Sequence, residues 1–433
     1  MVTAVKEKIT ALIKRKRKLD TTATADKAHK VNTVDNTCKA TADKAHKVRA
    51  LGKTQKATVG DLPLLVTVIL LSLFGTAMVA SAGYSFAELR YGDAFYFIKR
   101  QAVWLAIGFF AMWVGMQTPT SLIKKISPIA YGTTLLLLAL TLAIGMVGNG
   151  AQRWISIGPI TIQPSEIAKL TVVLMLSRYF SDNEARACRS KKRGEDFLWG
   201  TAFPCLILIA PILLVMLQHH LSCIIILGTL GLLLIISAGV RMKYLYAFMG
   251  VGAVGVCYIA FFTDYTKERI TVWQNPEAYK LTGGWQTLQG LMAIGSGGLF
   301  GKGLGGGELK HSYVSEPAND MIFAILCEEL GFVGAVAALL LFGFLIFRGY
   351  KIALGVRDSF SRLVALGITF KMAIQTLLNV AVVTNTIPNT GISLPLFSYG
   401  GSSLIMILFE MGLLLSIARG ETAVSKQRNR FTR

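Results

Sequence analysis

The sequence predicts an all-α polytopic membrane protein with about ten transmembrane helices. Of its 433 residues, 53% are hydrophobic and only 16% are charged, and the mean hydropathy is +0.53. These values are typical of a membrane protein and not of a soluble domain. A hydrocarbon core of about 30 Å requires roughly 20 apolar residues per helix. Segments of this kind lie at 62–82, 102–118, 126–147, 166–180, 198–217, 221–240, 243–263, 321–347, 363–384 and 395–418.

The distribution of basic residues predicts the orientation of these helices. The net charge is +21. If the N-terminus is cytoplasmic, the segments on the cytoplasmic side hold about 34 of the 45 Lys and Arg residues, which is the positive-inside bias of membrane proteins. An even number of spans places the C-terminus on the same side. The basic excess therefore reflects membrane topology, and nucleic acid is not an expected partner.

The chain is expected to have three parts. Residues 1–61 form a basic cytoplasmic tail in which ATADKAHKV occurs twice, at 23–31 and 40–48. Two copies are too few to build a solenoid, and the composition of the tail is typical of disorder. Residues 62–420 form the membrane domain, and residues 421–433 form a cytoplasmic C-terminal tail.

Three polar connections, rich in Gly and Pro, fall on the extracellular side in this topology. They are 148–166, 264–319 and 386–403, and the second is a large extracellular loop between the seventh and eighth spans. Irregular backbone at membrane depth is tolerated only where it is buried in protein or lines a water-filled cavity. The convergence of the three connections on one side predicts a binding cavity open to the exterior.

The glycine-rich segment GSGGLFGKGLGGG at 295–307 does not fit a nucleotide site. A P-loop fails at Ser296, where the first Gly is required, and at Gly303, which follows Lys302 in place of Ser or Thr. No strand–helix context surrounds the GxGxxG match. We expect a tight turn whose backbone N–H groups could face an anion.

Ionisable residues within the predicted spans are costly in lipid and therefore informative. Glu166 and Lys169 are three residues apart in QPSEIAK, so they can pair on one helix face. Asp320 and Glu328, eight residues apart, and Glu329 lie at the start of the eighth span. Two interpretations remain open: a charged cavity and a structural ion-pair network.

Lys371 and Glu410 form a separate case. At about 1.5 Å per residue, both lie roughly 12 Å from the cytoplasmic ends of the ninth and tenth spans. Equal depth on consecutive antiparallel helices predicts a buried salt bridge with a structural role.

Four motifs connect the chain to a known family. They are GAQRWISIG…QPSEIAKL, AIGSGGLFGKGLG, EPANDMIFAILCEELG and LPLFSYGGSS, in this order. At these motifs the chain resembles the SEDS (shape, elongation, division, sporulation) family, and the likeness extends over about residues 62–418. SYGGSS is more similar to the FtsW and SpoVE branch of that family than to RodA.

The resemblance implies a peptidoglycan glycosyltransferase of the cell membrane that polymerises lipid II during cell division or cell-wall synthesis. In that reaction the 4-hydroxyl of an acceptor GlcNAc attacks C1 of a donor MurNAc, and undecaprenyl pyrophosphate leaves. The expected partners are lipid II, a class B penicillin-binding protein that acts as a transpeptidase, and other cell-division proteins.

The family reaction needs a carboxylate to accept the hydroxyl proton. Family members usually carry an aspartate in the large loop, but the matching position in this chain is Tyr279. A phenol is a poor base at neutral pH. Glu277, two positions earlier, is the first candidate for the base, and Glu316 and Asp320 at the far end of the loop are the next. The remaining interpretation is a protein that lacks a base.

The developing charge on the pyrophosphate requires cations or N–H donors, and Arg153 and Lys169 are candidates. Tyr279 is expected to stack on a sugar. The expected substrate-binding residues are Arg153, Gln163, Glu166, Lys169, Tyr279, Lys302, Ser398 and Ser402. No metal-ligand motif occurs among the six cysteines or elsewhere. No cofactor is therefore expected, although a divalent cation could screen the pyrophosphate.

Two other functions are compatible with the sequence. A lipid II flippase or transporter could also use ten spans and buried charges, but no inverted repeat is apparent and one large loop on a single face favours an enzyme. A non-catalytic scaffold for a class B penicillin-binding protein would explain Tyr279. Formation of glycan polymer by the purified protein discriminates among the three.

Overall fold

The computed structural model describes residues 61–431 except for several short gaps and one longer one. The gaps are 149–150, 158–159, 188–193, 241–243, 245, 247–249, 251–263 and 311–316. The tail with its duplicated ATADKAHKV and most of the predicted seventh span, 243–263, lie outside the described residues. All described residues belong to the unit Val59–Arg433, one of the two units into which the chain divides.

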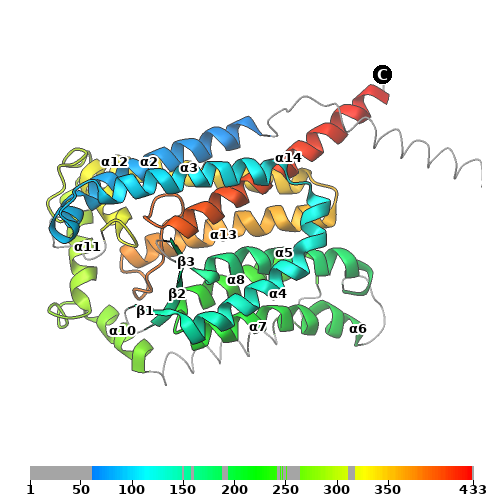
Figure 1. Ribbon diagram of the computed structural model, residues 1–433, viewed down its shortest axis with the longest axis horizontal. Coiled ribbons are helices and arrows are strands. Elements are labelled where there is room, and N and C mark those ends of the chain that lie inside the picture. The colour runs from blue at the N-terminus through cyan, green and yellow to red at the C-terminus, as the bar shows by residue number, and fades with distance from the viewer. Residues whose placement is uncertain are drawn as a thin grey trace, which may run out of the picture. The chain divides into compact units, whose positions relative to one another are not determined.

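Helices dominate the described part of the chain (Figure 1). In chain order the elements are α2 (Leu62–Tyr91), α3 (Tyr96–Gln117), α4 (Thr120–Ile144), β1 (Met146–Gly148), β2 (Ala151–Ile157), β3 (Ile160–Ile162), α5 (Pro164–Ala187), α6 (Glu195–Phe197), the π-helix η1 (Leu198–Ala202), α7 (Phe203–Leu217), α8 (Leu221–Ser237), α10 (Asp264–Gln274), α11 (Gly284–Ser296), α12 (Ile322–Gly355), α13 (Ser359–Val383) and α14 (Gly401–Phe431).

The predicted fold class is confirmed, because nine of the ten predicted spans are helical in the described residues. Within the described ranges, seven helices are long and apolar enough to cross a membrane: α2, α3, α4, η1 continued by α7, α12, α13 and Gly401–Gly420 of α14. α8 is apolar but shorter. α5 is long enough to cross a membrane but not apolar enough, because charged residues such as Glu166, Lys169 and Arg178 interrupt its apolar stretch.

Three connections differ from the irregular loops that the sequence predicts. Most of 148–166 belongs to an antiparallel sheet of order β1-β2-β3, whose strands are too short to give a clear sequence pattern. The large loop 264–319 contains α10 and α11. The tenth helix begins at Gly401 and not at 395, because the preceding residues form a turn with Leu396 at a positive φ of 64°.

Aspartate caps begin two of the spans. Asp61 accepts a hydrogen bond from Leu64 N at 3.0 Å, and α2 carries proline in its first turn, where its missing N–H costs nothing. Asp358 caps α13 by accepting from Ser361 N at 2.9 Å. Asp61 also accepts from Arg348 of α12, which ties the start of α2 to the end of a neighbouring span.

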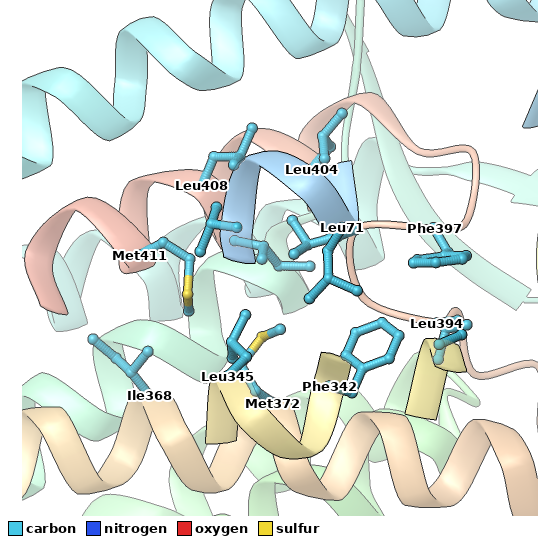
Figure 2. Packing of buried hydrophobic residues seen from close by; sticks show 14 of the residues in the cluster. Leu71, Phe342, Leu345, Ile368, Met372, Leu394, Phe397, Leu404, Leu408 and Met411 are labelled. Atoms are coloured by element: carbon cyan, nitrogen blue, oxygen red, sulfur yellow. The ribbon is translucent and has the colours of Figure 1, made fainter. Parts of the chain in front are cut away.

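Two buried clusters hold the bundle together. The first draws mainly on α2, α3, α12, α13 and α14, and Figure 2 shows Leu71, Phe342, Leu345, Met372 and Phe397 among the side chains packed in it. The second joins α4, α5, α7 and α8. Because α13 contributes residues to both clusters, it links the two halves of the bundle. In lipid, close packing of this kind is the main source of helix association.

Glycines allow several of these elements to approach closely. A Cβ added at Gly75 of α2 would lie 2.2 Å from the carbonyl oxygen of Leu396. We expect Gly75→Ala to destabilise the protein by about 1–3 kcal/mol through overpacking, measured as loss of monodisperse protein after heating in detergent. Gly132→Ala is the matched control, because a Cβ at Gly132 of α4 meets nothing within 4 Å. Equal stability of the two variants would contradict this packing.

α12 is interrupted at Gly331, which has φ 67° and ψ −167°. A break leaves helix carbonyl and N–H groups without intrahelical partners, and each unpaired group is costly in lipid. The glycine-rich segment supplies these partners. Its hydrogen bonds run from Lys302 N to Glu328 O (3.0 Å), from Gly303 N to Glu329 O (2.9 Å), from Phe332 N to Gly298 O (2.9 Å) and from Val333 N to Leu299 O (3.1 Å).

Candidate functional site

The candidate site lies at the end of the bundle where β1–β3, α10, α11 and the segment 386–400 gather. This end, on the left of Figure 1, is called the ribbon end below. The described residues that the sequence singles out lie on elements that start or end here. The cavity that the sequence predicts at this end stays a prediction.

A charged cluster occupies the ribbon end of α5. Lys169 Nζ lies 2.6 Å from Glu166 Oε1, and both side chains are buried. The predicted pairing of these residues is confirmed. Arg153 of β2 lies nearby and donates to the carbonyl oxygen of His219 at 2.8 Å. His220, in the turn between α7 and α8, is also buried and within electrostatic range of these charges.

Several buried polar atoms of this cluster have no hydrogen-bond partner within the described residues. They are Arg153 Nε, Ser165 Oγ, Glu166 Oε2, His220 Nδ1 and Thr390 Oγ1. Contacts connect the elements that carry them, because Ser222 Oγ donates to Thr390 O and Cys223 Sγ lies 3.9 Å from Ser165 O. Buried polar groups are normally paired. A group of unpaired ones is therefore suited to a polar ligand.

The buried His220 has a strongly shifted pKa. Burial, with the positive charges of Arg153 and Lys169, lowers the pKa of His220 from 6.5 to about 3. The imidazole is therefore neutral at physiological pH, and it adds no positive charge to the cluster.

This shift predicts a dependence of stability on pH. Between pH 6.5 and about 3 the unfolded state binds a proton at His220 that the folded state does not. Stability is therefore expected to fall as the pH drops through this window, by up to about 1.4 kcal/mol per pH unit. The slope should be smaller in His220→Gln, measured by thermal unfolding in detergent at pH 7 and pH 5. An identical slope in the two proteins would contradict the neutral imidazole.

A second network surrounds the carboxylate of Asp320, immediately before α12. Gln286 of α11 donates to both carboxylate oxygens, at 3.3 Å and 3.4 Å. Asn389 in turn donates to Gln286 Oε1 at 3.1 Å, and Arg269 of α10 donates to the carbonyl oxygen of Asn389. Asp320 is half-buried, so its carboxylate is both oriented by neighbours and open to contact from outside.

Further hydrogen bonds fix the segment 385–392 against the helices. Asn379 of α13 donates to Asp320 O at 2.9 Å and to Ile392 O at 2.6 Å. Trp273 of α10 donates to Asn385 O at 2.9 Å. Since Thr390 and Asn389 are consecutive, this segment joins the charged cluster to the network around Asp320.

The residues predicted on the large loop are distributed differently. Glu277 and Tyr279 lie on the turn between α10 and α11, and both are exposed. The turn is closed by Gly284 N donating to Tyr279 O at 3.0 Å. Glu316 lies outside the described residues.

Lys302, Glu328 and Glu329 belong to an ion-pair network. Lys302 Nζ lies 3.1 Å from Glu328 Oε1, and this hydrogen bond raises the pKa of Lys302. Lys310 Nζ lies 2.7 Å from Glu329 Oε1. Of the two interpretations left open by the sequence, the structural ion-pair network therefore applies to Glu328 and Glu329. The Glu328 carboxylate accepts from the backbone immediately after the glycine-rich segment, from Glu308 N at 2.9 Å. An anion bound by the backbone of the segment itself stays a prediction.

The remaining predicted binding residues lie near the start of α14 and α5. Ser398 Oγ donates to Asn319 O at 2.6 Å and accepts from Leu394 N at 2.7 Å, so it fixes the turn before α14. Ser402 is half-buried in the first turn of α14, and Gln163 is buried immediately before α5.

The predicted salt bridge between α13 and α14 is confirmed. Lys371 Nζ lies 2.7 Å and 2.9 Å from the two carboxylate oxygens of Glu410. Both side chains are buried. Lys371 also lies within electrostatic range of Glu166, so the positive charge of Lys371 contributes to the field at the charged cluster.

The sequence did not single out several members of the site. Gln286 and Asn389 carry no charge, and their role depends on contacts between segments about a hundred residues apart. His220, in the short polar turn QHH between two apolar segments, also carries no sequence signal of its burial. In the part of the chain that the structure describes, no three His, Cys, Asp or Glu side chains gather as a metal site.

Comparisons with known proteins identify the family of the chain. Residues 62–423 match the sequence model of the FtsW, RodA and SpoVE family, described as "Cell cycle protein". The chain is 40% identical over 364 residues to stage V sporulation protein E of Bacillus subtilis, covering 83% of this chain and 97% of that protein. It is 36% identical over 363 residues to a probable peptidoglycan glycosyltransferase FtsW of Geobacter sulfurreducens, covering 83% and 95%.

Two solved structures share the fold. One comes from work on "structural coordination of polymerization and crosslinking by a peptidoglycan synthase complex", with a TM-score of 0.69 and 27% identity over 83% of this chain and 98% of that chain. The other is the rod shape determining protein RodA of Thermus thermophilus, with a TM-score of 0.62 and 27% identity over 83% and 97%.

Proposed function

The chain belongs to the FtsW, RodA and SpoVE family, whose sequence model covers residues 62–423, and from this membership we propose that it is a peptidoglycan glycosyltransferase that polymerises lipid II. The relatives named FtsW support the reaction class. In the proposed reaction an acceptor sugar hydroxyl attacks the anomeric carbon of the donor, and undecaprenyl pyrophosphate is the leaving group.

The observation that carries the proposal is the group of buried, unpaired polar atoms beside Arg153 and Lys169. A pyrophosphate leaving group gains negative charge as the glycosidic bond breaks, and prearranged cations and donors stabilise that charge. We assign the pyrophosphate to this cluster, where Arg153 Nε and the Ser165 and Thr390 hydroxyls are available to donate. Glu166 keeps Lys169 in place by the 2.6 Å contact.

We propose Asp320 as the base that accepts the hydroxyl proton. Its carboxylate is held by Gln286 and is half-buried, and a fixed orientation favours proton transfer. The network through Asn389 connects it to the segment that carries Thr390. Glu277, which the sequence favours, is the alternative base. Its carboxylate is exposed on a turn, so it could reach a substrate, but the turn does little to fix its orientation.

The proposed function also implies an orientation in the membrane and a set of protein partners. The ribbon end faces the outside of the cell, with both termini cytoplasmic, because basic residues are concentrated at the opposite ends of the spans. A class B penicillin-binding protein is the proposed partner, which the peptidoglycan synthase complex among the structural relatives supports. Other cell-division proteins are further proposed partners.

The test is polymerisation by the purified protein. The protein is reconstituted with its transpeptidase partner and lipid II, and glycan strands are separated on a gel. Strands in the presence of a transpeptidase inhibitor are the expected result. Transfer of fluorescent lipid II across sealed vesicles without strands would instead indicate a flippase. Neither activity, beside an active family member as control, would indicate a scaffold.

A further inference from the structure

The glycine-rich loop at the break in α12 exposes a group of large apolar side chains. This loop patch consists of Leu299, Phe300, Leu304, Phe332 and Val333, which are 64%, 81%, 61%, 63% and 53% exposed. Val333 N donates to Leu299 O at 3.1 Å, so the loop and the α12 residues after the break form one surface. A continuous exposed apolar surface of this kind usually marks an interaction site.

Buried ion pairs hold this loop in place. Lys310 Nζ contacts Glu329 Oε1 at 2.7 Å with both side chains buried, and Ser81 of α2 donates to Glu329 at 2.6 Å. On the other side, Lys302 pairs with Glu328. The backbone that carries the exposed apolar side chains is therefore fixed to α2 and α12.

Two helices independently give the depth of the loop in the membrane. We take the ion pair of Asp61 with Arg348 as one boundary of the hydrocarbon core, because charged groups are costly inside it. On α2, Ser81 follows Leu62 by about 19 residues, or roughly 29 Å at about 1.5 Å per residue. On α12, Glu329 precedes Arg348 by about the same length. Since the core is about 30 Å thick, the contact of Ser81 with Glu329 marks the opposite boundary.

The loop patch lies on the membrane side of that boundary. Counted back from Arg348 along the part of α12 that follows the break at Gly331, Val333 lies 15 residues or about 22 Å away. In a core of about 30 Å this places Phe332 and Val333 several ångströms inside the hydrocarbon. The backbone of Leu299 lies beside Val333 at the same level. We propose that the side chains of Leu299, Phe300 and Leu304 insert into the acyl chains of the leaflet at the ribbon end, as an interfacial anchor of the large loop.

The chemistry of the loop fits this occupant. The break in α12 leaves four backbone groups without partners inside the helix, and the loop pairs with all four. None of them is therefore left unpaired beside lipid. Lys302 lies between Phe300 and Leu304 in sequence, and its ammonium group is not left unpaired beside lipid, because it pairs with Glu328 at 3.1 Å. The surface is also continuous with the lipid-facing side of α12, where Phe344 and Phe347 are exposed.

The test is the depth of a fluorophore on the loop. Phe300→Cys is labelled with the environment-sensitive dye NBD and reconstituted into phosphatidylethanolamine–phosphatidylglycerol vesicles, with or without nitroxide groups on the acyl chains. Lys280→Cys, exposed on the turn between α10 and α11, is the matched control. The background replaces Cys38, Cys188 and Cys257 by Ser, because the three described cysteines are buried.

At position 300 we expect blue-shifted emission that loses most of its intensity to the nitroxide lipids. At position 280 we expect quenching by aqueous iodide and little response to the nitroxide lipids. Iodide quenching at position 300 in plain vesicles would overturn the proposal. Protection there only after adding undecaprenyl phosphate or the transpeptidase would overturn it in favour of that occupant. Leu304→Cys repeats the measurement if Phe300→Cys aggregates.

Discussion

Asp320→Asn is expected to reduce the rate of lipid II polymerisation by about 10²–10⁴-fold, the usual contribution of a general base. The substitution preserves the shape of the side chain and removes only its charge and basicity. Gln286 can still hydrogen-bond to the remaining carbonyl oxygen, so the fold around α11 and α12 should persist. The measurement is the initial rate of strand formation on a gel, together with thermal stability in detergent.

Glu277→Gln and Tyr279→Phe are the matched controls on the exposed turn. Both are expected to polymerise at close to the wild-type rate, because neither carboxylate nor phenol at the turn is oriented by a described contact. A rate in Asp320→Asn equal to wild type, with activity lost in Glu277→Gln, would assign the base to Glu277.

Lys371→Met is expected to produce the largest loss of stability. It leaves the buried carboxylate of Glu410 without its partner at 2.7 Å. Removing one member of a buried ion pair costs about 3–5 kcal/mol, whereas replacing both by apolar residues is often close to neutral. The double variant Lys371→Met with Glu410→Met should therefore recover most of the lost stability, measured by thermal unfolding in detergent.

The exposed pair of Lys99 and Asp93 is the control for this experiment. Lys99→Met should change stability little, because solvent screens an exposed pair. If the double variant of the buried pair were no more stable than Lys371→Met alone, the structural role of that pair would be refuted.

Much of the fold could be predicted because lipid imposes strong patterns on a sequence. Long apolar segments identify the spans, and paired charges such as Lys371 with Glu410 stand out against them. α5 shows the limit of this pattern, because its charges lower its hydropathy although two of them, Glu166 and Lys169, are buried where α5 packs against its neighbours α4, α8 and α13.

The site was less accessible to sequence reasoning, for two physical reasons. First, its uncharged members act through long-range contacts, as Gln286 does with Asp320 and Asn389. Second, the partner of a charge can be an ordinary residue of an apolar helix. Ser81 of α2 contacts Glu329 at 2.6 Å, but nothing in the α2 sequence distinguishes it from Ser72 or Ser85.

The most direct test of the proposed reaction is a cryo-EM map of the protein with lipid II bound. We expect the pyrophosphate beside Arg153 and Lys169, and the acceptor sugar hydroxyl within hydrogen-bonding distance of the Asp320 carboxylate. A pyrophosphate bound away from this cluster, with no carboxylate near the acceptor hydroxyl, would contradict the assignment.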